Sequence, residues 1–219
     1  MKKVVLACLV AGLVSSLTAS AATVKFSDGI GNTGGGEFKA DVSDNGFGGT
    51  DYITFCLEYR ENLQMGKEYT YEISQAAMYN GNGTVDPISM ATAWLYNQFV
   101  KGTLAGIDRW GQLTGLYDSR NNADHLQKAI WYLEGESQGA NNAYARLAVA
   151  QAGMADNNGF YDVGVMNVWE IDSRGRKIAR QDQLISLPCR NVPDGGTSLV
   201  LLGMAMTGLA AANRRFRKS

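Results

Sequence analysis

Histidine, proline and cysteine are scarce in this chain of 219 residues, which contains one, three and three of them respectively. Because His125 is the single histidine, a zinc site built from His and Cys at the usual spacing is excluded. The sequence also lacks a nucleophile elbow, a phosphate-binding loop and a dinucleotide-binding fingerprint. These absences predict a protein without a metal site, without a cofactor and without enzymatic activity.

Four glutamates are the remaining candidates for catalysis, namely Glu58, Glu61, Glu134 and Glu136. Two carboxylates that flank a glycosidic bond are the catalytic pair of most glycoside hydrolases. Spacing in the sequence does not establish such a pair, and charged side chains of this kind usually lie on a solvated face. We therefore expect these glutamates to be exposed, and a secreted hydrolase is the least favoured function.

The N-terminus has the three parts of a secretory signal peptide. Lys2 and Lys3 form a positive start, Val4–Leu17 is apolar, and Ala19–Ala21 offers small residues for cleavage. We expect the export machinery and signal peptidase to act on residues 1–21. The mature chain would then begin at Ala22.

An apolar segment without any charge occupies residues 197–212, near the C-terminus. As a helix it would span roughly 24 Å, somewhat less than the ~30 Å of a bilayer core. A basic end over residues 213–219 follows, with Arg214, Arg215, Arg217 and Lys218. Because Lys and Arg remain on the cytoplasmic side, we expect a transmembrane helix that tethers the protein to the inner membrane with its C-terminus in the cytoplasm.

A short motif directly precedes this segment and consists of Val192, Pro193, Asp194, Gly195 and Gly196. Proline fixes its own φ and the glycines add conformational freedom, so the motif favours an extended and accessible segment. The order of motif, apolar segment and basic end resembles the PEP-CTERM sorting signal of bacteria that export exopolysaccharide. This resemblance implies processing by an exosortase, followed by a final place on the cell surface or in the extracellular matrix of a biofilm.

The basic residues of the two ends leave an acidic domain between them. Six of the 20 Lys and Arg residues lie in these ends. The other 14 lie between residues 22 and 196 together with all 21 Asp and Glu residues, so this part of the chain has a net charge of −7. Such a surface repels phosphate groups, which argues against nucleic acid as a partner. We expect one extracellular domain over residues 22–190 and a sorting tail over residues 191–219.

Hydrophobic periodicity and turn signals predict an α+β domain. Strands are expected over residues 37–42, 52–57, 68–73, 163–170 and 183–187, with a turn at residues 172–175. Helices are expected from an N-cap at Asp86, with Pro87 at the first helical position, to Val100, and over residues 124–134 and 142–152. The sequence therefore predicts a mostly antiparallel sheet or sandwich with an insert of about three helices.

The mature chain would contain two cysteines, Cys56 and Cys189. In an oxidising envelope the simplest prediction is one disulfide between them. That bond would join a strand near the start of the domain to the segment before the tail.

A different role for Cys56 follows from two short segments, Phe55-Cys56-Leu57-Glu58 and Leu126-Gln127-Lys128-Ala129-Ile130-Trp131. Together they resemble the thioester domains of bacterial surface adhesins, in which a cysteine on a strand meets a glutamine on a helix. The resemblance implies that the Cys56 sulfur replaces the Gln127 side-chain nitrogen, and that Trp131 shields the bond. Leu126, where the family commonly has threonine, and the charged Glu58 depart from the family pattern. Without a thioester, the second segment is an amphipathic helix with Gln127 at its edge.

These features predict a non-enzymatic, exported protein that contributes to adhesion, to matrix structure or to association with envelope glycans. The alternative is a covalent adhesin that couples the Cys56–Gln127 thioester to amines on a target surface.

Deletion of residues 192–219 tests the role of the sorting tail. We expect the truncated protein to lose its surface location and to show no processed form, because the motif, the apolar segment and the basic end are all removed. Cell fractionation and immunoblotting measure both properties. An unchanged location and an unchanged mature size would contradict the prediction.

Overall fold

Six antiparallel strands form the main sheet of the computed structural model, which describes residues 22–31, 36–43, 51–78 and 85–187. The sheet has the order β10-β9-β4-β1-β2-β3, and neighbouring strands pair antiparallel throughout. Its strands are β1 (Thr23–Asp28), β2 (Phe38–Val42), β3 (Asp51–Thr54), β4 (Glu68–Ser74), β9 (Val163–Ile171) and β10 (Lys177–Ser186). The expected antiparallel sheet is confirmed.

The two edges of this sheet meet, because the chain continues from β3 onto β10. The Leu57 N–H donates to Asp182 O at 3.0 Å, and the Leu184 N–H donates to Phe55 O at 3.0 Å. Between these two bonds, Cys56 and Gln183 form an isolated antiparallel bridge. Residues 55–57 therefore close the sheet on itself.

The closed sheet surrounds a core of its own. Alternate residues of each strand point inward, as the period of two requires. Tyr69 and Tyr71 of β4 are buried and Ile73 packs beside them. The other buried members of this core are Val24, Phe26, Ala40, Val42, Met166, Val168 and Ile185.

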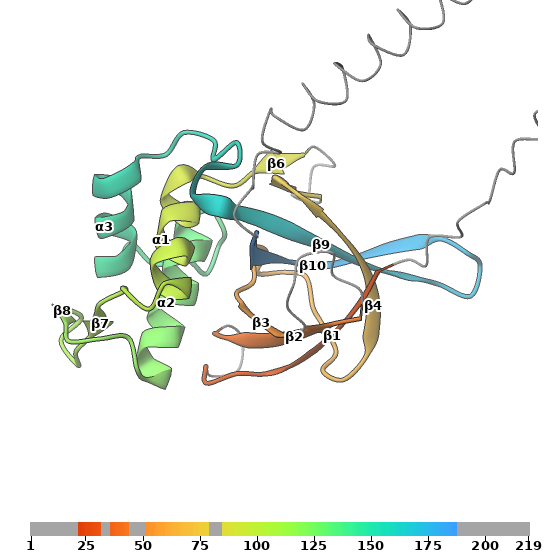
Figure 1. Cartoon of the computed structure of the whole chain (residues 1–219), viewed down its shortest axis with the longest axis horizontal. Coiled ribbons are helices and arrows are strands. Elements are labelled where there is room, and N and C mark those ends of the chain that lie inside the picture. The colour runs from red at the N-terminus through yellow and green to blue at the C-terminus, as the bar shows by residue number, and fades with distance from the viewer. Residues whose placement is uncertain (1–21, 32–35, 44–50, 79–84, 188–219) are drawn as a thin grey trace, which may run out of the picture.

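Three helices gather on one side of the sheet (Figure 1) and contribute most of a second core. They are α1 (Met90–Val100), α2 (Arg120–Leu133) and α3 (Ala143–Ala152). The smaller elements are β5 (Ala76–Ala77), β6 (Asp86–Pro87), β7 (Gly106–Ile107), β8 (Leu113–Thr114) and the 3-10 turn η1 (Phe160–Asp162). The core face of α2 consists of Leu126, Ala129, Ile130 and Leu133, which are all buried at the i, i+3, i+4, i+7 spacing of a helix. Gly135, at φ +77°, follows the end of that helix.

Several predicted boundaries are wrong, and each error has a local cause. Asp86 does not cap α1: Asp86 and Pro87 form β6 against β5, and the Ser89 side chain caps the helix by accepting the Thr92 N–H. The second helix begins at Arg120 rather than residue 124, because Ser119 supplies an earlier cap. β3 ends at Thr54 rather than at residue 57, because residues 55–57 no longer pair with β2 and pair with β10 instead. The sequence analysis predicted no element at the position of β1.

The last strand begins at Lys177, six residues before the predicted start. A register shift between Arg180 and Gln183 marks a β-bulge, which places Gln181, Asp182 and Gln183 in succession among buried groups. The Asp182 carboxylate accepts the Val168 N–H at 2.9 Å, the Met78 N–H at 2.7 Å and the side-chain nitrogen of Asn167 at 2.9 Å. The bulge is therefore held by a buried carboxylate that takes the place of ladder hydrogen bonds.

The other predicted parts of the chain lie outside the described residues. They are the signal peptide, Cys189, the sorting motif, the apolar segment and the basic end. Within the ranges that the structure describes, every helix is too short or too polar to cross a bilayer.

Substitution of Asp182 tests the buried carboxylate. We expect Asp182→Ala to lower the free energy of unfolding by roughly 3 kcal/mol, because two backbone N–H groups and Asn167 lose their acceptor. Asp172 is the matched control: it also accepts two backbone N–H groups, from Arg174 and Arg176, but it does so in the turn between β9 and β10. Asp172→Ala should cost about 1 kcal/mol or less. Equal losses in chemical denaturation would contradict this account.

Candidate functional site

The position of Cys56 in the sheet decides where its backbone groups point. In an antiparallel pair, successive residues direct their N–H and C=O groups alternately toward and away from the partner strand. The Phe55 C=O and the Leu57 N–H form their hydrogen bonds with β10. The N–H and C=O of Cys56 therefore face away from β10, toward α2.

The Gln127 side chain of α2 forms hydrogen bonds with both of these groups. The Cys56 N–H donates to Gln127 Oε1 at 2.9 Å, and Gln127 Nε2 donates to Cys56 O at 2.8 Å. Cys56 and Gln127 are each 1 % exposed. The carboxamide thus pairs with the strand as a neighbouring strand would. The expectation that Gln127 lies at the edge of an ordinary amphipathic helix is wrong, because the side chain is fully buried against Cys56.

The Cys56 sulfur faces a second glutamine, Gln183 of β10. Cys56 and Gln183 are directly opposite each other in the antiparallel pairing and carry their side chains on the same face. Gln183 Nε2 lies 3.5 Å from Cys56 Sγ. Burial raises the pKa of the Cys56 thiol to about 12, and the hydrogen bond from Gln183 opposes that rise. The thiol is therefore protonated at neutral pH.

Trp131 lies one helical turn beyond Gln127 and is 4 % exposed. Its ring packs edge-on against Tyr59, with ring centroids 5.1 Å apart and an interplanar angle of 84°. Its indole N–H has no hydrogen-bond partner among the described residues. The two rings form an aromatic wall next to the Cys56 segment, close to where the resemblance placed a shield.

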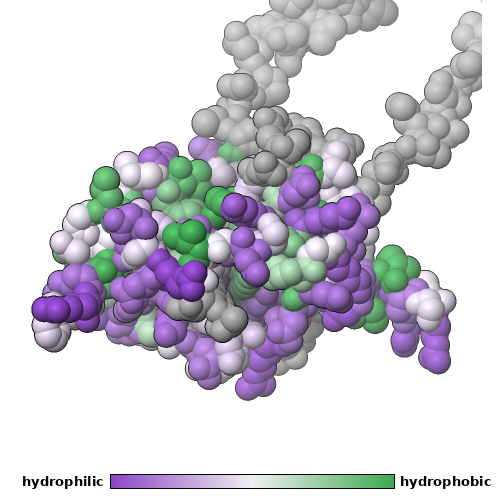
Figure 2. All heavy atoms as spheres, turned by 90° about the horizontal axis from the view of Figure 1, so that it is seen from below, coloured by the Kyte–Doolittle hydropathy of each residue, from purple (hydrophilic) through white to green (hydrophobic). Residues whose placement is uncertain are grey.

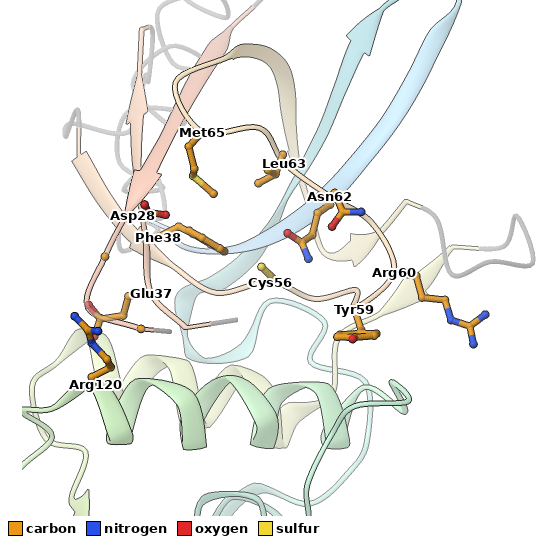
Figure 3. A pocket seen from close by; sticks show the side chains of 13 residues that line it. Asp28, Glu37, Phe38, Cys56, Tyr59, Arg60, Asn62, Leu63, Met65 and Arg120 are labelled. Atoms are coloured by element: carbon orange, nitrogen blue, oxygen red, sulfur yellow. The ribbon is translucent and has the colours of Figure 1, made fainter. Parts of the chain in front are cut away.

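Cys56 lines a pocket of about 710 Å³. In Figure 3 the Cys56 side chain points into this pocket, and α2 lies on the other side of the Cys56 backbone. The pocket wall combines charges of both signs with apolar side chains. Its lining residues are Asp28, Gly29, Gly31, Glu37, Phe38, Cys56, Tyr59, Arg60, Asn62, Leu63, Met65, Arg120 and Gln181.

A buried carboxyl group, Glu58, lies two residues after Cys56. Glu58 Oε2 accepts the Asp182 N–H at 2.8 Å, whereas Oε1 is buried without a hydrogen-bond partner among the described residues. Burial, together with the nearby Asp182 carboxylate, raises the pKa of Glu58 to about 9. Burial also raises the pKa of Asp182, but its three N–H donors oppose that rise, so Asp182 holds the negative charge and Glu58 keeps the proton.

The expectation of four exposed glutamates is therefore wrong in part. Burial, with the Asp182 charge as the second cause, raises the pKa of Glu61 to about 7. Glu134 accepts the Ser89 N–H at 3.2 Å and the Ser89 hydroxyl at 3.0 Å, which joins the end of α2 to the start of α1. Glu136 accepts the Tyr59 N–H at 3.2 Å. Glu136 therefore connects the end of α2 to the Cys56 segment, Glu134 connects α2 to α1, and none of the four glutamates lies on a fully solvated face.

The structure places the Gln127 carboxamide on the Cys56 backbone and adds Gln183, Asp182 and Glu58, which the sequence analysis did not assign to the site. One signal was available: residues 181–183 are three consecutive polar residues inside a strand, which is typical of a bulge or of a buried polar site. Within the described residues Cys56 is buried and has no disulfide partner, and Cys189 lies outside them. Among the described residues, no three His, Cys, Asp or Glu side chains are arranged to hold a metal ion.

Comparison with known proteins identifies the tail. Residues 191–216 match the VPDSG-CTERM motif, a PEP-CTERM-like C-terminal sorting motif read by exosortases. Gly195 stands where the motif's name has serine. The motif indicates an exported, surface-sorted protein that an exosortase-like enzyme processes. No curated protein and no solved structure matches the chain.

The protonated Glu58 predicts a specific pH dependence. The pKa of Glu58 is about 9 in the folded protein and 4.5 ordinarily, so the unfolded chain releases this proton first as the pH rises. The contribution of Glu58 to stability is therefore complete at low pH and is lost progressively between about pH 4.5 and 9. We expect Glu58→Gln to flatten the dependence of unfolding free energy on pH in this interval. Glu72→Gln, on the outer face of β4, is the control and should keep the wild-type slope. An unchanged slope in Glu58→Gln would contradict the assignment.

Proposed function

We propose that this exported surface protein is a non-enzymatic adhesin whose domain carries an internal thioester between Cys56 and Gln127. Amines on a target surface or in the extracellular matrix would be its partners. The observation that carries the proposal is the seating of the Gln127 carboxamide on Cys56, with both of its polar atoms bonded to the Cys56 backbone in a buried site.

Bond formation requires the Cys56 side chain to turn, because its sulfur lies on the side of Gln183. Side chains occupy three staggered positions about the Cα–Cβ bond. Rotation about that bond turns the sulfur toward the carboxamide that is already docked on the same residue. Holding the two reactants together in this way supplies much of the advantage that an intramolecular reaction has over a bimolecular one.

The reaction balances without a cofactor. The Cys56 sulfur forms a bond to Gln127 Cδ, the Cδ–Nε2 bond breaks, and the thiol proton leaves with the nitrogen as ammonia. An incoming amine then forms a bond to Cδ, the carbon–sulfur bond breaks, and the proton of the amine goes to the sulfur. The products are a substituted Gln127 amide and a free Cys56 thiol. In both steps the Cys56 N–H donates to Gln127 Oε1, where negative charge develops.

The surroundings favour a bond that persists until it meets an amine. Cys56 and Gln127 are buried, and the Tyr59 and Trp131 rings lie beside them, so bulk water has little access to the carbonyl. The pocket of about 710 Å³ is lined by Cys56 and not by Gln127, so an amine would reach Gln127 Cδ from this side only past the Cys56 side chain. Asp28 and Glu37 in the pocket wall suit a cationic amine, whereas Arg60 and Arg120 in the same wall oppose it.

A second candidate function is non-covalent association with matrix glycans such as exopolysaccharide. Trp110, in the hairpin of β7 and β8, is 72 % exposed and stacks with Arg109 at 4.7 Å. An exposed indole face of this kind is suited to pack against a sugar ring. The face of the molecule in Figure 2 is largely hydrophilic, with hydrophobic side chains in small separate patches, which also suits a polar partner.

Mass spectrometry of the intact, processed protein tests the thioester. We expect a mass lower than the sequence mass by about 17 Da, one ammonia, and uptake of methylamine or of a fluorescent primary amine without any added enzyme. Cys56→Ser preserves the backbone pairing with Gln127 and should lose both properties. Peptide mapping should place the incorporated amine on Gln127.

Cys189→Ser is the matched control. The thioester predicts that this variant keeps the mass loss and the amine uptake. A wild-type mass lower by about 2 Da that returns to the sequence mass in Cys189→Ser would establish the Cys56–Cys189 disulfide and overturn the thioester. Amine found on Gln183 instead of Gln127 would also overturn the assignment. A mass equal to the sequence mass, with glycan binding that Trp110→Ala abolishes, would favour the second candidate.

A further inference from the structure

Gln183 is the one side chain of the described residues with a hydrogen bond to the Cys56 sulfur. It is completely buried, and it belongs to the bulged part of β10, where residues 181–183 face the Cys56 segment. A glutamine in this position is costly unless its amide is satisfied. The sulfur is a weak hydrogen-bond acceptor, so its bond with Gln183 contributes little to stability if Cys56 is only a small buried side chain.

The surroundings of Gln183 fix which end of its amide meets the sulfur. Gln183 Nε2 also lies 3.3 Å from Gln181 O, which can only accept a hydrogen bond. If the amide were reversed, its oxygen would face that carbonyl oxygen. The nitrogen therefore points toward Gln181 O and Cys56 Sγ together, and each of its two hydrogens has an acceptor.

We propose that Gln183 is a catalytic residue of the thioester, which donates its Nε2 hydrogen to the Cys56 sulfur as that sulfur leaves Gln127 Cδ. This inference rests on the proposed thioester function. When an amine attacks, the carbon–sulfur bond breaks and its electron pair goes to the sulfur, so negative charge develops there. As the carbon–sulfur bond lengthens, the sulfur turns back toward the position that it occupies in the free thiol, where Gln183 Nε2 lies 3.5 Å from it.

The donor has a larger effect on the leaving sulfur than on the intact thioester. A thioester sulfur accepts hydrogen bonds poorly, whereas a thiolate accepts them strongly, and a bond to an ionised acceptor is roughly twice as strong as a neutral one. The site otherwise disfavours the anion, since burial alone raises the pKa of the Cys56 thiol. An interaction that strengthens as the bond breaks lowers the barrier, because it stabilises the transition state more than the ground state.

The test compares Gln183→Met with the wild-type protein. Methionine has nearly the shape of glutamine and cannot donate a hydrogen bond. We expect the variant to couple methylamine roughly 100-fold more slowly, the lower end of the effect of losing one preorganised donor to a developing anion. The rate is followed by intact mass, starting from protein in which the loss of about 17 Da shows that the thioester is present.

Asn157→Leu is the matched control for the loss of a buried amide. Asn157 is completely buried and donates to Val163 O at 3.0 Å, next to the helices. We expect this variant to couple methylamine at the wild-type rate.

The outcomes separate the two proposals. If the wild-type protein has no thioester by mass, the proposed function fails, and the role of Gln183 fails with it. If the wild-type protein has the thioester, and Gln183→Met couples at the wild-type rate or Asn157→Leu is slowed equally, only the role of Gln183 is overturned. If Gln183→Met is folded by circular dichroism and never forms the thioester, while Asn157→Leu forms it, the proposal is supported, since formation passes through the same sulfur anion.

Discussion

The pairing of residues 55–57 with β10 is the constraint on which the rest of the site depends. Two backbone hydrogen bonds, from Leu57 to Asp182 and from Leu184 to Phe55, bring the two edges of the sheet together. The same pairing turns the Cys56 N–H and C=O outward, where they would be buried without partners if nothing met them. A buried, unpaired backbone group costs about as much as a lost hydrogen bond, so the fold requires an acceptor and a donor at that point. Gln127 supplies both from one side chain, and in doing so fixes α2 against the closed sheet.

The bulge in β10 accounts for the polar groups that surround this junction. A regular strand would direct residues 181–183 alternately to its two faces, whereas the register shift leaves all three buried. The bulge removes the Val168 N–H from the strand pairing, and the Asp182 carboxylate accepts it instead. Gln181 Nε2 donates to Glu58 O at 2.7 Å, and Gln183 Nε2 donates to the Cys56 sulfur. With the Asp182 charge held by three donors, a second charge on Glu58 is unfavourable, so Glu58 stays protonated. One irregularity in one strand therefore determines the hydrogen bonding and the protonation around Cys56.

The sequence predicted the features that depend on local pattern. Alternation located β2, β4 and β9, and the i, i+3, i+4, i+7 spacing gave the core face of α2, because these periods belong to the element itself. It failed where a distant partner decides the outcome. β3 stops early because residues 55–57 turn to β10, more than 120 positions away in the chain, and Pro87 is in a strand because β5 is available to pair with it. In the site, the pairing of Cys56 with Gln127 was predicted through a family resemblance, whereas Gln183, Asp182 and Glu58 depend on a register shift that no local pattern specifies.

The arrangement makes the proposed chemistry a property of the folded state. In the unfolded chain Cys56 and Gln127 are separated by 70 intervening residues, and closing a loop of that length is entropically costly. Folding meets that cost through the two cores and the sheet closure, and the carboxamide arrives at Cys56 as part of satisfying the backbone. In the proposed mechanism, the closure of the sheet and the assembly of the Cys56–Gln127 pair are therefore the same event.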